Sequence, residues 1–455
     1  EAPLDVRPQP VVLRRAGHFV DRVLEEASER FSVDPSAERG LSILTTLDWF
    51  DQQRAEEAVA WGLRALEEGW EAQREDDEPL QAALVSVAVD TGEIRSWVGG
   101  REYAVSQFDR ASAARRQAGS AFKPVVYAAA LQEDVATPAS MLPDEPLTVR
   151  LAGVAWEPRN DDGEFHGWVT VRSALERSLN VPTARLALAT GLDAVVEMAH
   201  SLGVENRLRP FPALALGAFE VTPREMAQVY ATLAAGGVRR PLHGVVTVLD
   251  GAGAVVAGRP LAEPVRAVGA PVAHVVTRLL QGVVDRGTGS SLRDQGLRDP
   301  LAGKTGTTNG RRDSWFGGFS PDRATLVWVG YDDNRETRLS GARAALPIWG
   351  RFVGGVRPPG GYDDFARPPG IETAWVDGET GLRATLSCPR PYEEVFLEGQ
   401  APWRYCYLHE GAAGSARTVR RDVVEERPEP RKRGFWKRLF GGKKNKKGGK
   451  TDDGD

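Results

Sequence analysis

Short runs of alternating or continuous apolar residues, bounded by turn residues, predict β-strands in two groups. The first group precedes residue 100 and the second follows residue 300. The runs are residues 41–47, 83–89, 94–98, 302–308, 315–319 and 324–331. Short turns separate 83–89 from 94–98 and also separate the three runs after residue 300, which favours antiparallel pairing within these two sets. Residues 243–257 alternate in the same way around Asp250-Gly251 and predict a separate hairpin.

Helical spacing of apolar residues dominates between the two groups of strands. Residues 170–236 predict helices that are interrupted at Asn180-Val181-Pro182 and at Gly191. Thr222-Pro223-Arg224-Glu225 predicts a helix start, because it combines a capping box with proline at the first helical position. Residues 271–284 predict a further helix. The order of strands, helices and strands predicts an α+β fold, an antiparallel sheet flanked by helices with an inserted all-helical subdomain.

The two ends of the chain differ from this central part. Residues 1–40 are proline-rich and then helical, which predicts a linker from a preceding domain, and Asp48 is a candidate cap for the helix after the first strand. A helix around residues 344–352 is followed by Pro358-Pro359-Gly360-Gly361, which marks a boundary. The predicted units are 1–40, the main domain 41–356, a small β-rich extension 357–410 and a disordered basic tail 411–455.

Charge is unevenly distributed along the 455 residues, whose formal net charge is −5. Residues 431–450 hold ten Lys and Arg and no acidic residue, so the rest of the chain is strongly acidic. An acidic body argues against nucleic acid as a partner. There is no run of eighteen apolar residues and no signal-peptide pattern, and the chain begins with Glu1, so we expect an excised piece without its targeting segment or membrane anchor.

The two cysteines, Cys388 and Cys406, are too far apart for a CxxC redox pair. The sequence around them does not suggest the histidines that a zinc site needs. A structural disulfide and two separate thiols both remain open. The sequence predicts neither a metal nor a cofactor.

Ser120 and Lys123 form a Ser-x-x-Lys pattern at a predicted helix start, which places an amine beside a hydroxyl. A serine needs a neighbouring base to become a nucleophile, and a lysine can serve only if burial or a second cation lowers its pKa. Four residues alone are weak evidence, since a helix cap followed by a solvated lysine gives the same pattern.

Two further patterns strengthen this hypothesis. Ser178-Leu179-Asn180 lies at a break between helices, where a hydroxyl and a carboxamide can point into a cleft. Lys304-Thr305-Gly306-Thr307 lies on a predicted strand, whose glycine permits the close approach of another backbone. The three patterns in this order are those of penicillin-recognising serine enzymes.

On these motifs the chain resembles the transpeptidase part of a bifunctional (class A) penicillin-binding protein. The resemblance extends from about Phe19 to about Phe352 and more weakly to Cys406. It also includes the runs at residues 45–48, 99–101, 107–111, 156–160, 217–223 and 282–289.

The resemblance implies a role for each motif residue. Ser120 attacks the penultimate D-Ala carbonyl of a peptidoglycan stem peptide, with Lys123 as its base. Ser178 relays the proton to the leaving nitrogen, and Asn180 holds Lys123 and the substrate amide. Lys304 supplies the cation that keeps Lys123 neutral.

The strand motif is expected to bind the substrate terminus. Thr305 and Thr307 bind the terminal carboxylate, with Gly306 between them. The backbone amides of Ser120 and Thr307 form the oxyanion hole.

Two departures from the pattern limit what the resemblance implies. Leu179 stands where β-lactamases commonly carry aspartate, which favours a synthetic enzyme. The glycosyltransferase domain that normally precedes this module is absent from the chain, so no polymerising activity is expected of it. The alternatives are a D,D-carboxypeptidase, a β-lactamase-like hydrolase, or a non-catalytic β-lactam-sensing or wall-binding module.

The expected partners are peptidoglycan stem peptides and β-lactams. The expected location is the cell envelope, at the outer face of the cytoplasmic membrane. The basic tail could contact anionic lipid or acidic wall polymers, or remain solvated. The sequence specifies neither the acceptor amine, the oligomeric state nor any partner protein.

Overall fold

The computed structural model describes residues 14–35, 38, 40–69, 78–151 and 154–409. The predicted basic tail and the first residues of the predicted linker therefore lie outside the described residues. Within the described ranges, no helix combines the length and the apolar content that crossing a bilayer requires.

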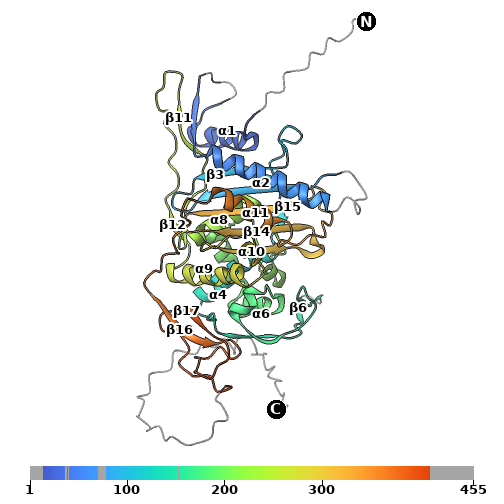
Figure 1. The fold of residues 1–455 in the computed structure, drawn as a ribbon. Helices are drawn as coiled ribbons and strands as arrows, with labels where there is room; N and C mark the ends of the chain where they lie inside the picture. The colour runs from blue at the N-terminus through green and yellow to red at the C-terminus, as the bar shows by residue number, and fades with distance from the viewer. Residues whose placement is uncertain (1–13, 36–37, 39, 70–77, 152–153, 410–455) are drawn as a thin grey trace, which may run out of the picture.

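A five-stranded antiparallel sheet forms the centre of the molecule, in the order β13-β14-β15-β2-β3 (Figure 1). Its strands are β13 (Ala302–Thr307), β14 (Asp313–Phe319), β15 (Arg323–Gly330), β2 (Gln81–Ala88) and β3 (Ile94–Val98). Both predicted groups of strands are confirmed, and the pairing of β15 with β2 joins the runs at 83–89 and 94–98 to the later group in one sheet. The run at 41–47 forms a strand of a separate small sheet.

Each face of the sheet has its own apolar core, because successive side chains of a strand point to opposite faces. In β15, Leu326 and Trp328 belong to the larger core, which includes residues of α8 (Pro223–Ala234) and α9 (Ala270–Asp285). Val327 and Val329 belong to the second core, which includes residues of α2 (Trp49–Glu68) and α11 (Ala345–Val356). The sheet is therefore flanked by helices on both faces, as predicted.

The helical subdomain lies between β3 and β13 in the sequence. It contains α4 (Lys123–Gln132), α5 (Val171–Glu176), α6 (Asn180–Thr190) and α7 (Leu192–Leu202). The predicted capping box at Thr222 is confirmed at the start of α8. The predicted break around Pro182 is displaced, because Pro182 lies in the first turn of α6, where a missing N–H costs no helical hydrogen bond. The break lies instead between Glu176 and Asn180.

The N-terminal region packs α1 (Gly17–Phe31) against a small sheet of β1 (Ser42–Thr45) and β11 (Val245–Leu249). The predicted hairpin at residues 243–257 is confirmed only next to its turn, where Leu249 and Val255 form one antiparallel bridge and the Val256 amide donates to the Val248 carbonyl. The main strand partner of β11 is β1. Val245 and Val248 lie in the main core beside residues of α1. Burial against residues distant in sequence therefore determines the pairing of β11 more than the turn that follows it. Asp48 caps α2 as predicted, accepting from the amides of Phe50 and Asp51.

The remaining elements are short and connect these units. They are α3 (Arg110–Ala113), β4 (Arg116–Gln117), η2 (Gly119–Phe122), β5 (Met141–Asp144), β6 (Val149–Leu151), β7 (Val154–Trp156), β8 (Gly167–Thr170), η3 (Pro212–Leu216), β9 (Glu220–Val221), β10 (Val238–Arg239), β12 (Val265–Arg266), α10 (Ser291–Asp294) and η4 (Asn309–Arg311).

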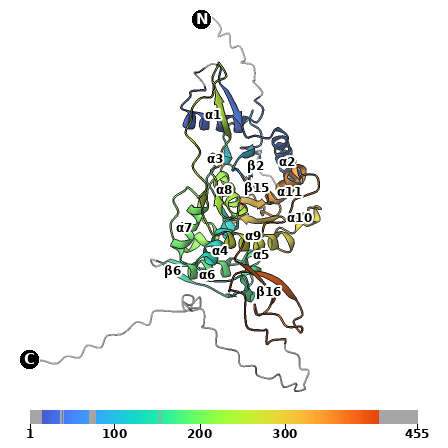
Figure 2. The same ribbon diagram turned by 90° about the vertical axis from the view of Figure 1, so that its left-hand side faces the viewer.

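The C-terminal extension is built on one antiparallel pair, β16 (Ile371–Asp377) and β17 (Pro391–Leu397). It lies at the end of the molecule opposite α1 (Figures 1 and 2). The extension therefore lies at the end of the main domain that carries the helical subdomain. The domain limits themselves stay a prediction.

Candidate active site

Ser120 lies in a tight turn directly before α4. The predicted helix start is modified here, because Gly119–Phe122 form a 3₁₀ turn and the α-helix begins at Lys123. Gly119 has φ +54°, and a Cβ on it would lie 2.5 Å from the carbonyl oxygen of Thr307. Glycine is therefore required both by the backbone conformation and by the proximity of β13.

The strand motif on β13 lies against this turn. A Cβ on Gly306 would lie 2.8 Å from the Cβ of Ala121, so the predicted close approach at this glycine is confirmed. The indole Nε1 of Trp315, on the neighbouring strand, donates to the carbonyl of Gln117 at 2.7 Å. The structure thus brings the Ser120 turn and the Lys304–Thr307 strand together.

The third motif connects α5 to α6 and faces Lys123. The Lys123 Nζ lies 2.6 Å from the carbonyl oxygen of Ser178, 2.8 Å from Asn180 Oδ1 and 3.3 Å from Ser178 Oγ. The carbonyl oxygen of Leu179 lies at 3.2 Å. Ser178 has φ 58°, a strained conformation for a residue other than glycine, and such strain is frequent at functional sites.

The surroundings of Lys123 suit a neutral amine. Burial lowers the pKa of Lys123 to about 7, although the negative charge of Asp161 acts in the opposite direction. A neutral amine has two N–H donors and one lone pair. It can donate to the Ser178 carbonyl and to Asn180 while its lone pair accepts a hydroxyl proton, which is what a general base requires.

Lys304 is equally buried, and its Nζ donates to the carbonyl of Thr305 at 3.1 Å and to Thr305 Oγ1 at 3.3 Å. Burial lowers the pKa of Lys304 well below its ordinary value; the charge of Lys123 lowers it further, and Asp161 opposes both effects. The two amines are coupled, so protonation of either one disfavours protonation of the other. This differs from the expectation that Lys304 carries a permanent charge.

The two threonines of the strand motif lie on one face of β13, since they are two residues apart. Thr305 Oγ1 is 2.8 Å from Thr288 Oγ1, and Thr307 Oγ1 accepts from the Gly341 amide at 3.1 Å. Thr288 was not singled out by the sequence motifs, although it falls within the resembling run 282–289.

Asn160 is a second residue that the motifs did not identify. Its Oδ1 accepts from the amides of Asn180 at 2.8 Å and Val181 at 3.2 Å, at the start of α6. Its Nδ2 donates to both carboxylate oxygens of Asp144 at 2.9 Å. Asn160 thereby fixes the segment that presents Ser178 and Asn180. The only sequence signal for it was its place in the run 156–160.

The orientation of the Asn180 amide is also fixed. Its Nδ2 donates to the carbonyl of Arg159 at 2.8 Å and to Asp161 Oδ1 at 3.2 Å. These bonds leave Oδ1 facing Lys123. Asp161 therefore acts on the site in two ways, through this hydrogen bond and through its charge.

Comparison with known proteins gives two family matches. The family described as penicillin binding protein transpeptidase domain matches residues 82–351. The family described as penicillin-binding protein 1A, C-terminal domain, matches residues 367–411.

Curated relatives resemble most of the chain. Penicillin-binding protein 1B of Escherichia coli is 39% identical over 362 residues, which are 78% of this chain and 42% of the relative. Penicillin-binding protein 1B of Vibrio cholerae is 36% identical over 381 residues, 83% of this chain and 47% of the relative. The chain thus spans about half the length of the curated relatives it matches.

Solved structures share the fold. Penicillin-binding protein 1A of Haemophilus influenzae superposes with a TM-score of 0.78 at 23% identity, covering 88% of this chain and 78% of that one. PonA1 of Mycobacterium tuberculosis superposes with a TM-score of 0.66 at 28% identity, covering 77% and 95%. A PonA1 structure in complex with penicillin V, at 29% identity, has a TM-score of 0.63 and covers 78% and 99%.

Proposed function

This chain belongs to the penicillin-binding protein transpeptidase family, and we propose that it is a serine D,D-transpeptidase of peptidoglycan synthesis with Ser120 as its nucleophile. Its relatives include penicillin-binding proteins 1A and 1B. The observation that carries the residue assignment is the contact of a buried Lys123 with Ser178 and Asn180, one turn after Ser120. The roles below follow from that contact.

In the acylation step, neutral Lys123 removes the proton of the Ser120 hydroxyl. The Ser120 Oγ then attacks the carbonyl carbon of the penultimate D-Ala, and the carbonyl oxygen becomes an oxyanion. The first N–H groups of a helix have no acceptor within it, so the amide of Ser120 is available to this oxygen. The amide of Thr307 is the second donor that we assign to the oxyanion hole.

Collapse of the tetrahedral intermediate requires a proton on the leaving nitrogen. Ser178 Oγ lies 3.3 Å from Lys123 Nζ, so it can pass the proton from Lys123 to that nitrogen. Terminal D-Ala departs, and Ser120 retains the acyl group as an ester. An amine of a second stem peptide then attacks the ester carbonyl, and the same relay carries the proton of the amine to Lys123. The bond between the acyl carbon and Ser120 Oγ breaks, Lys123 returns the proton to Ser120 Oγ, and the cross-linked peptide departs.

We assign the substrate carboxylate to Lys304, Thr305 and Thr307. A carboxylate beside a buried lysine favours the charged amine and raises its pKa. The lowered pKa of Lys304 without substrate is consistent with this role, since the carboxylate of a bound stem peptide would raise that pKa and favour the charged amine. The resulting charge lowers the pKa of Lys123 and keeps the base neutral.

Acylation by penicillin tests the nucleophile. The protein binds β-lactams as a member of its family, and the expected adduct is one penicilloyl group on Ser120. Mass spectrometry of a proteolytic digest should locate the adduct on wild-type protein. Ser120→Ala should carry none, whereas Ser112→Ala, on α3, should be acylated normally. An adduct of unchanged yield on folded Ser120→Ala contradicts the assignment.

The products of the same preparation separate transfer from hydrolysis. Transpeptidation yields cross-linked stem peptides, whereas a carboxypeptidase releases D-Ala alone. Free D-Ala without dimers, in the presence of acceptor amine, would favour the hydrolytic alternative.

We also propose that the protein works at the outer face of the cytoplasmic membrane. The basic residues 431–450 support this location, because a run of Lys and Arg favours contact with anionic lipid or wall polymer. They lie outside the described residues. Salt-sensitive binding to vesicles containing anionic lipid, lost when residues 431–450 are deleted, would support lipid contact.

A further inference from the structure

The C-terminal extension has little apolar core of its own. Its cluster of buried hydrophobic residues comprises Ala374, Val376 and Phe396, together with Ala139 of the main domain. The segment after β17 leaves Trp403 and Tyr407 exposed at 73% and 71%. Units of this size are commonly stabilised by a disulfide or a structural metal.

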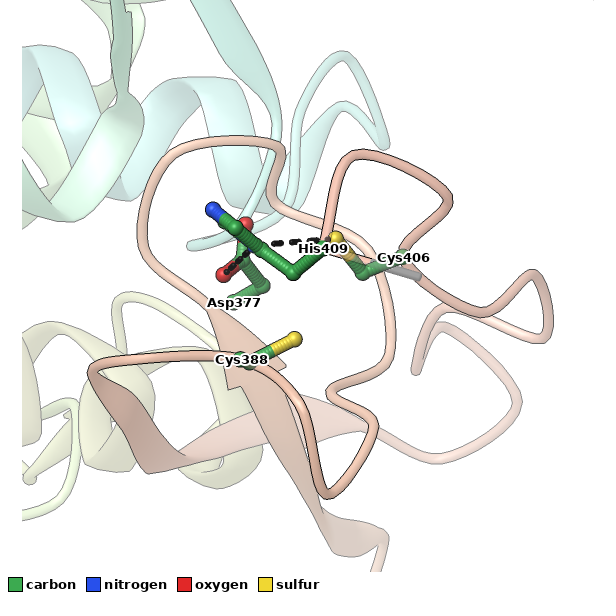
Figure 3. A group of neighbouring side chains, drawn as sticks. All are labelled: Asp377, Cys388, Cys406 and His409. Atoms are coloured by element: carbon green, nitrogen blue, oxygen red, sulfur yellow. Dashed lines mark hydrogen bonds and ion pairs between the residues drawn. The ribbon is translucent and has the colours of Figure 1, made fainter. Parts of the chain in front are cut away.

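Four potential metal ligands converge in this extension. They are Asp377 at the end of β16, Cys388 in the loop between the two strands, and Cys406 and His409 after β17 (Figure 3). One ligand atom from each lies within 4.8 Å of the other three. Asp377 and Cys406 are 1% and 0% exposed. Three separate segments of the chain thus present their donors to one point.

The Asp377 carboxylate is already oriented by its own turn. Oδ1 accepts from the Thr380 amide at 2.9 Å, the Thr380 hydroxyl at 2.8 Å and the Glu379 amide at 3.2 Å. Oδ2 instead faces His409 Nδ1 at 3.1 Å. Oδ1 thus accepts three hydrogen bonds from its own turn, and Oδ2 points toward the other potential metal ligands.

The imidazole of His409 is held from both sides. Its Nδ1 lies 3.4 Å from Cys406 Sγ and 3.1 Å from Asp377 Oδ2, and its Nε2 lies 3.5 Å from Glu379 Oε2. A metal-bound histidine commonly donates its second ring N–H to a carboxylate, which fixes the tautomer. Glu379 is placed to accept that proton while Nδ1 binds the metal.

Cys388 Sγ contacts the Thr385 amide and hydroxyl. It lies 3.3 Å from the Thr385 amide and 3.5 Å from the Thr385 hydroxyl. The amide donates to the sulfur, and the hydroxyl can also donate. Both cysteines are free thiols in the structure.

We propose that Asp377, Cys388, Cys406 and His409 form a structural zinc site that fastens the loops of the extension to β16. Two thiolates, an imidazole and a carboxylate are ligands that zinc accepts, and four protein ligands make a closed tetrahedral site without an open position for catalysis. His409 follows Cys406 by three residues in the sequence, a spacing that was not recognised there as a pair of metal ligands. The inference is independent of the assignment of Ser120.

A disulfide between Cys388 and Cys406 is the competing use of the same sulfurs. A disulfide would need neither Asp377 nor His409, and it would leave them as a pair with no metal to bind. The convergence of nitrogen and oxygen donors on the sulfurs favours the metal. The experiment must therefore measure both metal content and thiol oxidation.

Metal content is measured on the whole chain, purified without a metal-affinity tag. We expect about one zinc per chain by elemental analysis. Cys406→Ser and His409→Ala should lose most of this zinc. The matched control His200→Ala, which replaces a histidine of α7, should retain it. Less than a tenth of a zinc per chain in the wild type, also after reduction and incubation with Zn²⁺, overturns the proposal.

Thiol titration of the same protein separates zinc from a disulfide. Zinc predicts that both thiols react slowly in the native protein and fully after chelator and denaturant, with no reductant added. Two thiols that appear only after reduction identify a disulfide and overturn the proposal. Two thiols that react fully in native protein without chelator also overturn it.

A cobalt spectrum tests the site on the wild-type chain, so the result does not depend on variants that could fail to fold. Co²⁺ added to the reduced wild-type chain should give the intense visible bands of a tetrahedral site and a sulfur-to-metal band in the ultraviolet. Zn²⁺ should displace both. Weak octahedral bands alone would contradict the proposed tetrahedral zinc site. In the variants, penicillin acylation of Ser120 checks separately that the main domain is folded.

Discussion

The charge of Lys123 results from two opposed effects at the residue scale. Burial lowers its pKa to about 7, and Asp161 partly offsets that effect. The base is active only when it is neutral. The rate of acylation should therefore be low below neutral pH and should rise as the pH passes through about 7.

Asp161→Asn should move this rise to lower pH. The substitution removes a negative charge that favours the protonated amine, so the pKa of Lys123 falls and the neutral base persists in more acidic solution. The measurement is the rate of penicillin acylation against pH. Asp162→Asn is the matched control, since Asp162 interacts with His166 instead. A shift toward higher pH in Asp161→Asn would contradict this account.

The sequence led to a proposal for the motif residues, but it could not predict their electrostatics. Ser120, Lys123 and Lys304 were identified from the order of three short patterns. The pKa of Lys304, however, depends on complete burial beside a second amine, which sequence spacing does not report. Asn160 was missed for a similar reason, because its hydrogen bonds to the start of α6 are made across twenty residues.

At the scale of elements, α5 carries the Ser178 segment and is held by ion pairs. Arg172 forms a bidentate contact with Glu394 of β17 and a 3.0 Å bond to Glu176. Arg286 also pairs with Glu176. Burial opposes the charge of Arg172, but Glu394 and Glu176 raise its pKa above the ordinary value. The extension thus contacts the helix that precedes the relay serine.

Glu394→Gln should destabilise the protein by about 3 kcal/mol, because it leaves the buried Arg172 with one carboxylate instead of two. Denaturant unfolding measures the change. The control Glu393→Gln alters an exposed neighbour on the same strand and should have an effect within about 0.5 kcal/mol. Equal stability of both variants would show that the buried pair contributes no net stability.

Alternation of apolar residues predicted the elements well where neighbours in sequence are also neighbours in space. The strands β13, β14 and β15 follow one another and were recovered with their pairing. At residues 243–257 only the turn of the predicted hairpin was recovered, because β11 has its main partner about two hundred residues earlier, in β1. Local turn signals carry no information about such a partner.

On the scale of the whole molecule, the main domain and the extension share few buried residues. Within the described part of the chain, Val395 is the one buried residue that the extension adds to the two large cores, and the extension's other apolar contacts with them come from the partly buried Tyr362, Phe365, Ile371 and Leu397. The ion pair of Arg172 and Glu394 is fully buried and connects the two units. The main domain should therefore fold without the extension, and this pair should account for much of their coupling.

This coupling is tested by making the Arg172→Met substitution in two backgrounds, the whole chain and a chain that lacks residues 367–455. In the whole chain, Arg172→Met leaves Glu394 buried without its partner and should cost about 3 kcal/mol. In the shortened chain Glu394 is absent and Arg172 becomes accessible to water, so the same substitution should change the free energy of unfolding by no more than about 0.5 kcal/mol. Denaturant unfolding of the four proteins gives both values, and penicillin acylation of Ser120 should persist in the shortened chain. An equal cost in both backgrounds would mean that Arg172 stabilises the main domain alone, through Glu176, and that the extension is held by other contacts.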